Sequence, residues 1–147
     1  MDLRERPSHQ IATNQPVIRT VAMPADANPA GDIFGGWLMW QMDLAAGSVA
    51  TRATQGRCAT VAVEAMSFMS PVLVGDEVSL FASIVRRGRT SLSIRVEAWR
   101  RPRENEQTAM VTQASFTFVA IDEDRKPRPL PVKVEGSPMD PSSGAAE

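Results

Sequence analysis

The sequence contains one cysteine, one histidine and no tyrosine among its 147 residues. A single cysteine, Cys58, rules out an intramolecular disulfide, and together with His9 it cannot supply the usual ligands of a cysteine and histidine zinc site. His9 lies in a polar leader, which nearly excludes catalysis by a histidine base, a serine triad or a cysteine and histidine pair. Any chemistry of this chain is therefore expected to rely on carboxylates and to need no metal.

Long apolar runs and an excess of one charge are also missing. No stretch approaches the roughly 18 apolar residues of a membrane span, and the first ten residues lack the apolar core of a signal peptide. The formal net charge of -1 provides no field for nucleic acid or an anionic membrane. The sequence motifs of phosphate-binding and dinucleotide-binding loops are absent too, so we expect no cofactor. Together these absences predict a cytoplasmic protein without a nucleic-acid partner or a membrane partner.

The length and the composition, with 43% hydrophobic and 22% charged residues, fit a single globular domain. Residues 1–15 are polar and aperiodic, and we expect them to form a flexible leader. Prolines recur from Asp122 onward, so residues 122–147 are expected to form an extended tail that becomes disordered towards its end. The folded unit is therefore predicted to span residues 16–121.

One long helix is predicted from Gly36 to about Thr54, a segment without proline that is rich in alanine, leucine and methionine. Segments rich in valine, isoleucine, threonine and phenylalanine predict strands over residues 17–23, 58–69, 77–87, 90–101 and 108–121. Along residues 92–99 the side chains alternate, which indicates a sheet with one dry face. The apolar side carries Leu92, Ile94, Val96 and Ala98, and the other side carries Ser93, Arg95, Glu97 and Trp99. The predicted fold is therefore α+β, with a five-stranded antiparallel sheet wrapped around one long central helix.

Asp43 is the one charged residue of the predicted helix that lies outside its polar stripe. On a helical wheel it lies opposite a polar stripe formed by Gln41, Ser48, Thr51, Arg52 and Gln55. Its neighbours on the wheel are small or apolar, namely Gly36, Met39, Ala46, Gly47 and Ala50. A buried carboxylate without a partner costs several kcal/mol, which favours a functional base. The structural alternative is an interaction of about 0.3–1 kcal/mol with the helix dipole.

Two consecutive glycines, Gly35 and Gly36, stand at the entrance of this helix. They would let a ligand approach the backbone closely, where the free N–H groups of Gly36 and Trp37 are candidate donors to a carbonyl oxygen. Turning the chain is the alternative role of the glycines. In the preceding loop, Asn28 could orient a water or donate to a carbonyl, or it could satisfy its own turn.

Arginines cluster at both ends of the strand expected over residues 90–101. One group is Arg86, Arg87 and Arg89, which is followed by the hydroxyls of Thr90 and Ser91. Such a turn could hold phosphates, although solvated strand ends are the commoner reason for clustered arginines.

Several segments of the sequence match a known signature. They are Ala22-Met-Pro-Ala-Asp-Ala-Asn28, Gly31-Asp-Ile-Phe-Gly-Gly-Trp-Leu-Met39, Gln41-Met-Asp43, Thr60-Val-Ala-Val-Glu, Phe68-Met-Ser-Pro-Val-Leu-Val-Gly-Asp76, Arg89-Thr-Ser91 and Lys126-Pro-Arg-Pro-Leu-Pro131. Across roughly residues 16–133 the chain resembles the YciA-type acyl-CoA thioester hydrolases, which have the hotdog fold. It departs from that pattern at Ala30 and Trp40, where the family commonly carries a second asparagine and a small serine.

The resemblance implies hydrolysis of acyl-CoA to the free acid and CoA without a cofactor. It implies a homodimer with sheets paired edge to edge, often assembled as a trimer of dimers. The aspartate matching Asp43 would activate water or attack directly, and the backbone N–H groups at Gly36 would polarise the thioester carbonyl. The asparagine matching Asn28 would face Asp43 from the other subunit.

The candidate catalytic residues are thus Asp43, Asn28, Gly36 and Trp37. The candidate residues for binding CoA or the acyl group are Phe34, Gly35, Met39, Thr60, Arg86, Arg87, Arg89, Thr90 and Ser91. A non-catalytic acyl-CoA sensor that uses the same pocket is the alternative function. A hydratase of the same fold is disfavoured, because the expected folded unit contains no histidine.

Overall fold

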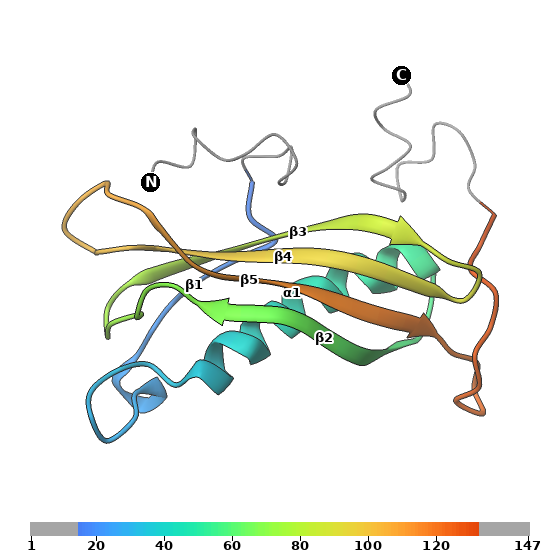
Figure 1. The fold of residues 1–147 in the computed structure, drawn as a ribbon, viewed down its shortest axis with the longest axis horizontal. Helices are drawn as coiled ribbons and strands as arrows, with labels where there is room; N and C mark the ends of the chain where they lie inside the picture. Colours follow the sequence, from blue (N-terminus) through green and yellow to red (C-terminus); the bar gives the residue numbers. More distant parts are fainter. Residues whose placement is uncertain (1–14, 133–147) are drawn as a thin grey trace.

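The computed structural model describes residues 15–132, so the predictions for the leader before residue 15, including His9, and for the tail beyond residue 132 lie outside the described residues. The described chain folds into one long helix and a five-stranded antiparallel sheet, which confirms the predicted fold class (Figure 1). The elements are β1 (Ile18–Val21), the short 3₁₀ helix η2 (Pro24–Asp26), α1 (Gly35–Thr54), β2 (Cys58–Phe68), β3 (Glu77–Arg87), β4 (Ser91–Arg101) and β5 (Ala109–Ala120).

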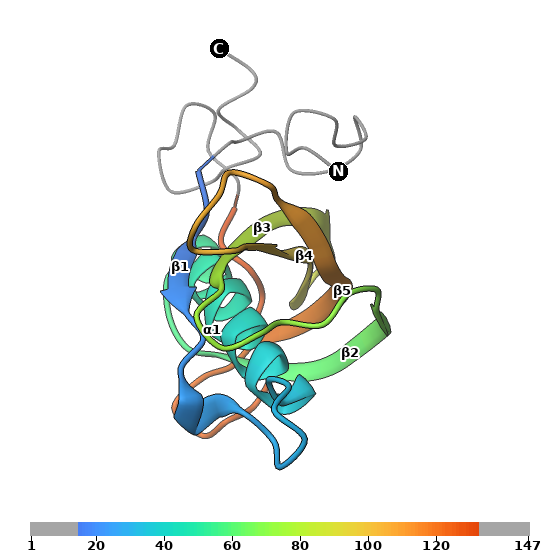
Figure 2. The same cartoon turned by 90° about the vertical axis from the view of Figure 1, so that its left-hand side faces the viewer.

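The strands are ordered β1-β3-β4-β5-β2, so β1 and β2 form the two edges of the sheet. Figure 2 looks along the molecule and shows the sheet curving around α1. Among the described residues, the eleven-residue β2 pairs only with β5. Its other edge is left as a row of backbone donors and acceptors.

The core lies between α1 and the concave face of the sheet. The buried side of α1 presents Leu38, Met42 and several alanines, whose small side chains let the helix lie close to the strands. Leu92, Ile94, Val96 and Ala98 meet them from β4, as their alternation predicts, together with Leu80 and Phe116. This packing fixes which side of α1 faces the sheet.

The convex face of the sheet is not uniformly exposed to solvent. The prediction that only one face of the sheet is buried is therefore incomplete. Trp99 and Glu97, assigned to the polar side of the alternation, are 1% and 0% exposed. Trp99 packs with Phe81 and Met110 in a second cluster, and its indole Nε1 donates to the Glu97 carboxylate at 2.9 Å. A large aromatic side chain can therefore bury the carboxylate beside it on the face that alternation alone marks as polar.

The packed unit extends past its predicted boundary at residue 121. Arg128 donates from its guanidinium to the carbonyl oxygens of Ile121, Thr54 and Arg57 at 2.9, 3.1 and 3.2 Å. Leu130 packs against the core and donates its backbone N–H to Arg89. The proline-rich segment contacts the domain through one arginine and one leucine, which need no strand pairing.

Candidate active site

Asp43 lies on the third turn of α1 and is half-buried. The Thr60 hydroxyl on β2 donates to Asp43 Oδ1 at 2.6 Å. The register of β2 against β5 shifts directly after Thr60, which places a bulge at Val61. Bulges of this kind re-aim side chains next to active sites. Thr60 holds one carboxylate oxygen, and the other oxygen has no partner among residues 15–132.

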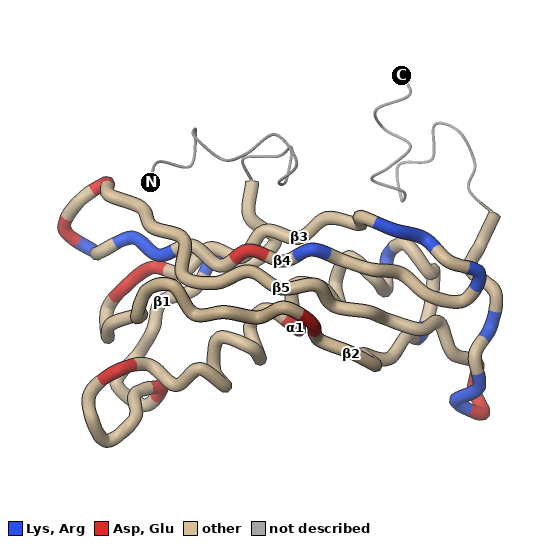
Figure 3. Tube along the Cα trace, in the orientation of Figure 1, with Lys and Arg blue, Asp and Glu red and all other residues tan. Residues whose placement is uncertain are grey.

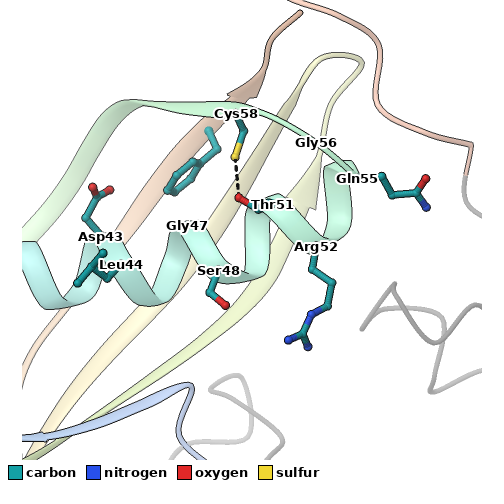
Figure 4. A pocket seen from close by; sticks show the side chains of 10 residues that line it. Asp43, Leu44, Gly47, Ser48, Thr51, Arg52, Gln55, Gly56 and Cys58 are labelled. Carbon is teal, nitrogen blue, oxygen red and sulfur yellow. Dashed lines mark hydrogen bonds between the residues drawn. The ribbon is translucent and has the colours of Figure 1, made fainter.

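An open groove of about 760 Å³ begins at Asp43 and follows the C-terminal half of α1 (Figure 4). Its lining combines small, hydroxyl and apolar side chains with one arginine. The lining residues are Asp43, Leu44, Gly47, Ser48, Thr51, Arg52, Gln55, Gly56, Cys58 and Phe118. Thr60 pairs directly with Phe118 across the strands, so the hydroxyl that holds Asp43 and the ring that lines the groove adjoin each other.

The wheel prediction for Asp43 is only partly confirmed. Ala46 and Ala50 are fully buried under the sheet, but Gly36 and Met39 are exposed. The carboxylate therefore sits at the border of the buried side of α1 and not inside an apolar interior. A wheel gives the angle of a side chain and does not show how far round the helix the sheet extends. The uncovered side is itself apolar, because Trp40 and Leu44 are 59% and 47% exposed.

Of the two donors predicted at the entrance of α1, one is free and the other is not. Trp37 donates its backbone N–H to the Phe34 carbonyl at 3.1 Å, whereas the Gly36 N–H has no acceptor among residues 15–132. A Cβ at Gly36 would meet nothing within 4 Å, so the space beside this N–H is open. At Gly35 a Cβ would come within 3.2 Å of the Phe68 ring, so this glycine permits close packing at the helix entrance.

Gly36 and Asp43 are seven residues apart on α1, a separation of about 10.5 Å along the helix axis at 1.5 Å per residue. The N–H bonds of the first helical turn also point out of the N-terminus, which is away from Asp43. A carbonyl oxygen bound at Gly36 therefore lies beyond the reach of the Asp43 carboxylate of the same chain.

The other predicted site residues lie in two further places. Asn28 accepts hydrogen bonds at Oδ1 from the backbone N–H groups of Ala30 and Asp32 at 2.9 and 3.1 Å, so it does stabilise its own loop. Phe34 and Met39 are exposed near the start of α1. Among the described residues, Thr60 is the only other predicted site residue whose side chain hydrogen-bonds to the Asp43 carboxylate within one chain.

The predicted phosphate-binding residues lie in the turn between β3 and β4 and at the strand ends beside it: Arg86 and Arg87 end β3, Arg89 and Thr90 are in the turn, and Ser91 begins β4. Figure 3 shows basic residues gathered at this end of the molecule, whereas acidic residues are frequent at the other end. The end of the groove lies close by, because Ala120 pairs with Cys58 on β2 and donates its N–H to the Thr90 carbonyl.

The groove itself was not predicted from the sequence. The polar stripe of Ser48, Thr51, Arg52 and Gln55 on the helical wheel lines this groove. Its continuation through Gly47 to Asp43, at steps of four residues, was the signal that could have revealed a groove. No helix within residues 15–132 is long and apolar enough to cross a membrane.

Comparison with known proteins agrees with this geometry. Residues 30–107 match the family model described as the thioesterase superfamily. The acyl-CoA thioester hydrolase YciA of Salmonella typhimurium is 52% identical over 120 residues, which cover 80% of this chain and 90% of that protein. YciA of Escherichia coli K12 is 46% identical over 129 residues, covering 86% and 98%.

Among solved structures, the hexameric thioesterase of Yersinia pestis superposes with a TM-score of 0.77 at 46% identity and covers 82% of this chain and 99% of its own. The family model spans more than half of the chain, and the two YciA relatives cover most of it. The chain therefore belongs to the thioesterase superfamily and, within it, to the YciA-type acyl-CoA thioester hydrolases.

Proposed function

We propose that the protein hydrolyses acyl-CoA thioesters by an attack of water that Asp43 assists. The observation that carries this proposal is the half-buried Asp43 carboxylate at the start of an open groove, held at one oxygen by Thr60 at 2.6 Å. A fixed carboxylate with one free oxygen can orient and deprotonate a water molecule. The names of the relatives supply the substrate class, acyl-CoA.

The complete site requires two copies of the chain. Because Gly36 and Asp43 of one chain cannot reach the same thioester, the Gly36 N–H of a second copy must bind the carbonyl oxygen next to Asp43. A twofold axis between the copies creates two such sites, each with one residue from either chain. Asn28 of the second copy would approach the same thioester, using the side-chain N–H₂ group that its loop leaves unused.

The uncovered surface of the single chain supports this pairing. The free edge of β2 can extend the sheet into a second copy, and Val61 on that strand is exposed. Trp40 and Leu44 add apolar surface on the adjacent side of α1. Contiguous apolar surface of this kind marks protein interfaces. The Yersinia relative is hexameric, and we propose a homodimer that assembles further as a trimer of dimers.

The reaction would proceed in two balanced steps. Water attacks the thioester carbon and gives a proton to Asp43, and the oxyanion that forms is stabilised by the Gly36 N–H of the second copy. The intermediate then collapses with cleavage of the carbon–sulfur bond. The thiolate of CoA leaves and takes the proton back from Asp43. This chemistry needs no cofactor.

The remaining predicted residues have roles around this centre. Phe34 and Met39 are exposed apolar side chains near the start of α1 and would contact the acyl group. Gly35 would act indirectly, because its missing side chain lets the Phe68 ring pack at the helix entrance beside the acyl group. The basic turn from Arg86 to Ser91 would bind phosphates of CoA.

The experiment is to replace Asp43 by asparagine and to follow thiol release from butyryl-CoA with a thiol-reactive dye. We expect the rate to fall about 10²–10⁴-fold, as for loss of a general base. Asp124→Asn is the matched control, because Asp124 is exposed on the turn after β5. A parent rate in Asp43→Asn would remove Asp43 from the mechanism. Binding of butyryl-CoA without thiol release by the parent would identify a sensor instead.

A further inference from the structure

We propose that the groove along the C-terminal half of α1 binds the pantetheine arm of the CoA thioester, with Arg52 binding a phosphate at the far end. This inference rests on the proposed hydrolysis and extends it by assigning Gly47, Ser48, Thr51 and Arg52 to the substrate. None of these residues hydrogen-bonds to the Asp43 carboxylate, so they are assigned a binding role and not a catalytic one.

The groove has a floor and two walls. Its floor is one row of side chains on α1 spaced by four residues, which contains Asp43, Gly47, Thr51 and Gln55. One wall is the next row, with Leu44, Ser48 and Arg52, and the other wall is formed by Cys58 and Phe118 of the sheet. Figure 4 shows Asp43 and Thr51 on the sheet side of the helix, and Ser48 and Arg52 on the other side.

The length of this floor suits the arm. Asp43 and Gln55 are twelve residues apart, which corresponds to about 18 Å along the helix axis. The pantetheine arm has about thirteen bonds between its sulfur and its first phosphorus, and at roughly 1.25 Å per bond it extends for about 16 Å. A thioester at Asp43 therefore places the first phosphate of CoA near the C-terminal end of α1.

The chemistry of the lining also suits the arm, which carries two amides, one hydroxyl and a dimethyl carbon. Ser48 and Thr51 supply hydroxyls that can donate to or accept from amides. Leu44 and Phe118 supply apolar contacts. Thr51 Oγ1 lies 3.6 Å from Cys58 Sγ, a weak contact that an amide of the ligand can replace.

Gly47 leaves the floor of the groove without a side chain at its position. A glycine inside a helix costs about 1 kcal/mol relative to alanine, so its presence there calls for a reason. Packing does not require it, because a Cβ at Gly47 would meet Phe118 at 3.8 Å, an ordinary van der Waals contact. The missing side chain instead leaves space in the groove between Asp43 and Thr51, and the pantetheine arm has to pass through this space.

Arg52 supplies positive charge towards the end of the groove that lies away from Asp43, where the first phosphate is expected. It is exposed, and none of the ion pairs found among residues 15–132 involves it. Stabilisation of the helix C-terminus by its charge is the structural explanation. That explanation does not account for the groove leading to Arg52 or for Arg57, which lies between α1 and β2. It does not account for the basic β3–β4 turn at this end of the molecule either (Figure 3).

The test compares butyryl-CoA with butyryl-pantetheine, which has the same thioester and arm but no phosphate. Arg52→Gln should raise the KM for butyryl-CoA about tenfold or more, as expected for the loss of one charge-assisted phosphate contact, with kcat nearly unchanged. Its kcat/KM for butyryl-pantetheine should equal that of the parent. Arg103→Gln, an exposed arginine between β4 and β5, is the matched control.

A second variant tests the floor. Gly47→Leu should raise the KM for both substrates about tenfold or more, because its side chain fills the groove. Its unfolding midpoint should not fall, since leucine is the better helix former and a Cβ fits. The proposal is wrong if Gly47→Leu leaves both KM values unchanged, or if Arg52→Gln affects the two substrates equally.

Calorimetric titration of the parent and Arg52→Gln with CoA itself separates this proposal from the proposed hydrolysis. Weaker CoA binding by the variant supports the groove even if no thioester is cleaved. Equal binding by the two proteins overturns the assignment of Arg52, whatever the hydrolysis assay shows.

Discussion

The hydroxyl of Thr60 provides a sharp test of how Asp43 is held. Thr60→Val keeps the shape of the side chain and removes the donor to Asp43 Oδ1 at 2.6 Å. A hydrogen bond to a charged group contributes about 1.5–3 kcal/mol. If the bond is needed to orient the carboxylate in the transition state, kcat/KM should fall about tenfold to a hundredfold.

The assay is continuous thiol release from butyryl-CoA, with thermal unfolding measured on the same samples. Thr60→Ser keeps the hydroxyl and should recover most of the lost rate. Thr117→Val is the control. Thr117 precedes Phe118 on β5, and Phe118 lines the groove whereas Thr117 does not. A Thr60→Val enzyme with kcat/KM within about twofold of the parent would refute the positioning role.

Four further predictions concern assembly, stability and chemistry. Val61→Lys on the free edge of β2 should shift the protein towards monomers in size-exclusion chromatography and abolish activity. Val85→Lys is the control and should do neither, because Val85 is 54% exposed and Val61 is 57% exposed. Arg128→Ala should lower the free energy of unfolding in urea by about 2–3 kcal/mol, since it removes three hydrogen bonds to carbonyl oxygens. Leu80→Ala, at a fully buried position, should cost about 2–5 kcal/mol by the same measurement. A single turnover in ¹⁸O-labelled water should label the product acid; label in Asp43 instead would indicate a nucleophilic aspartate.

The elements of this fold were predictable because their signals are local. The helix has no proline from Gly36 to Thr54, and the observed α1 differs from the prediction by one residue at its start. The strands rich in β-branched residues end at turn signals, and their observed ends lie within two residues of the predicted ones. Asp43 was identifiable because a charge out of phase with a polar stripe is visible in the sequence.

The contacts of these elements were less predictable because they depend on packing between distant segments. The partner of Asp43 is Thr60 on another element, and the sequence contains no local signal of the adjacent bulge at Val61. The Trp37 N–H was predicted to be free, but the first turn closes onto the Phe34 carbonyl. Glu97 was placed on a polar face by alternation, which does not anticipate that a neighbouring tryptophan covers it.

The central claim is that one site is built from Asp43 of one chain and the Gly36 N–H of another. Asp43→Asn removes the carboxylate, and Gly36→Pro removes the N–H at a position in the first helical turn where proline is tolerated. Each variant should be inactive alone. Gly36→Ala, which keeps the N–H and meets open space within its own chain, should retain more activity than Gly36→Pro.

The decisive measurement is the rate of butyryl-CoA hydrolysis after the two inactive variants are unfolded together and refolded as a mixture. Random pairing makes about half of the dimers mixed, and each mixed dimer has one intact site of two, so the mixture should recover about a quarter of the parent activity. Refolding of each variant alone should recover none. A mixture that forms mixed dimers and stays inactive would contradict a site shared between chains.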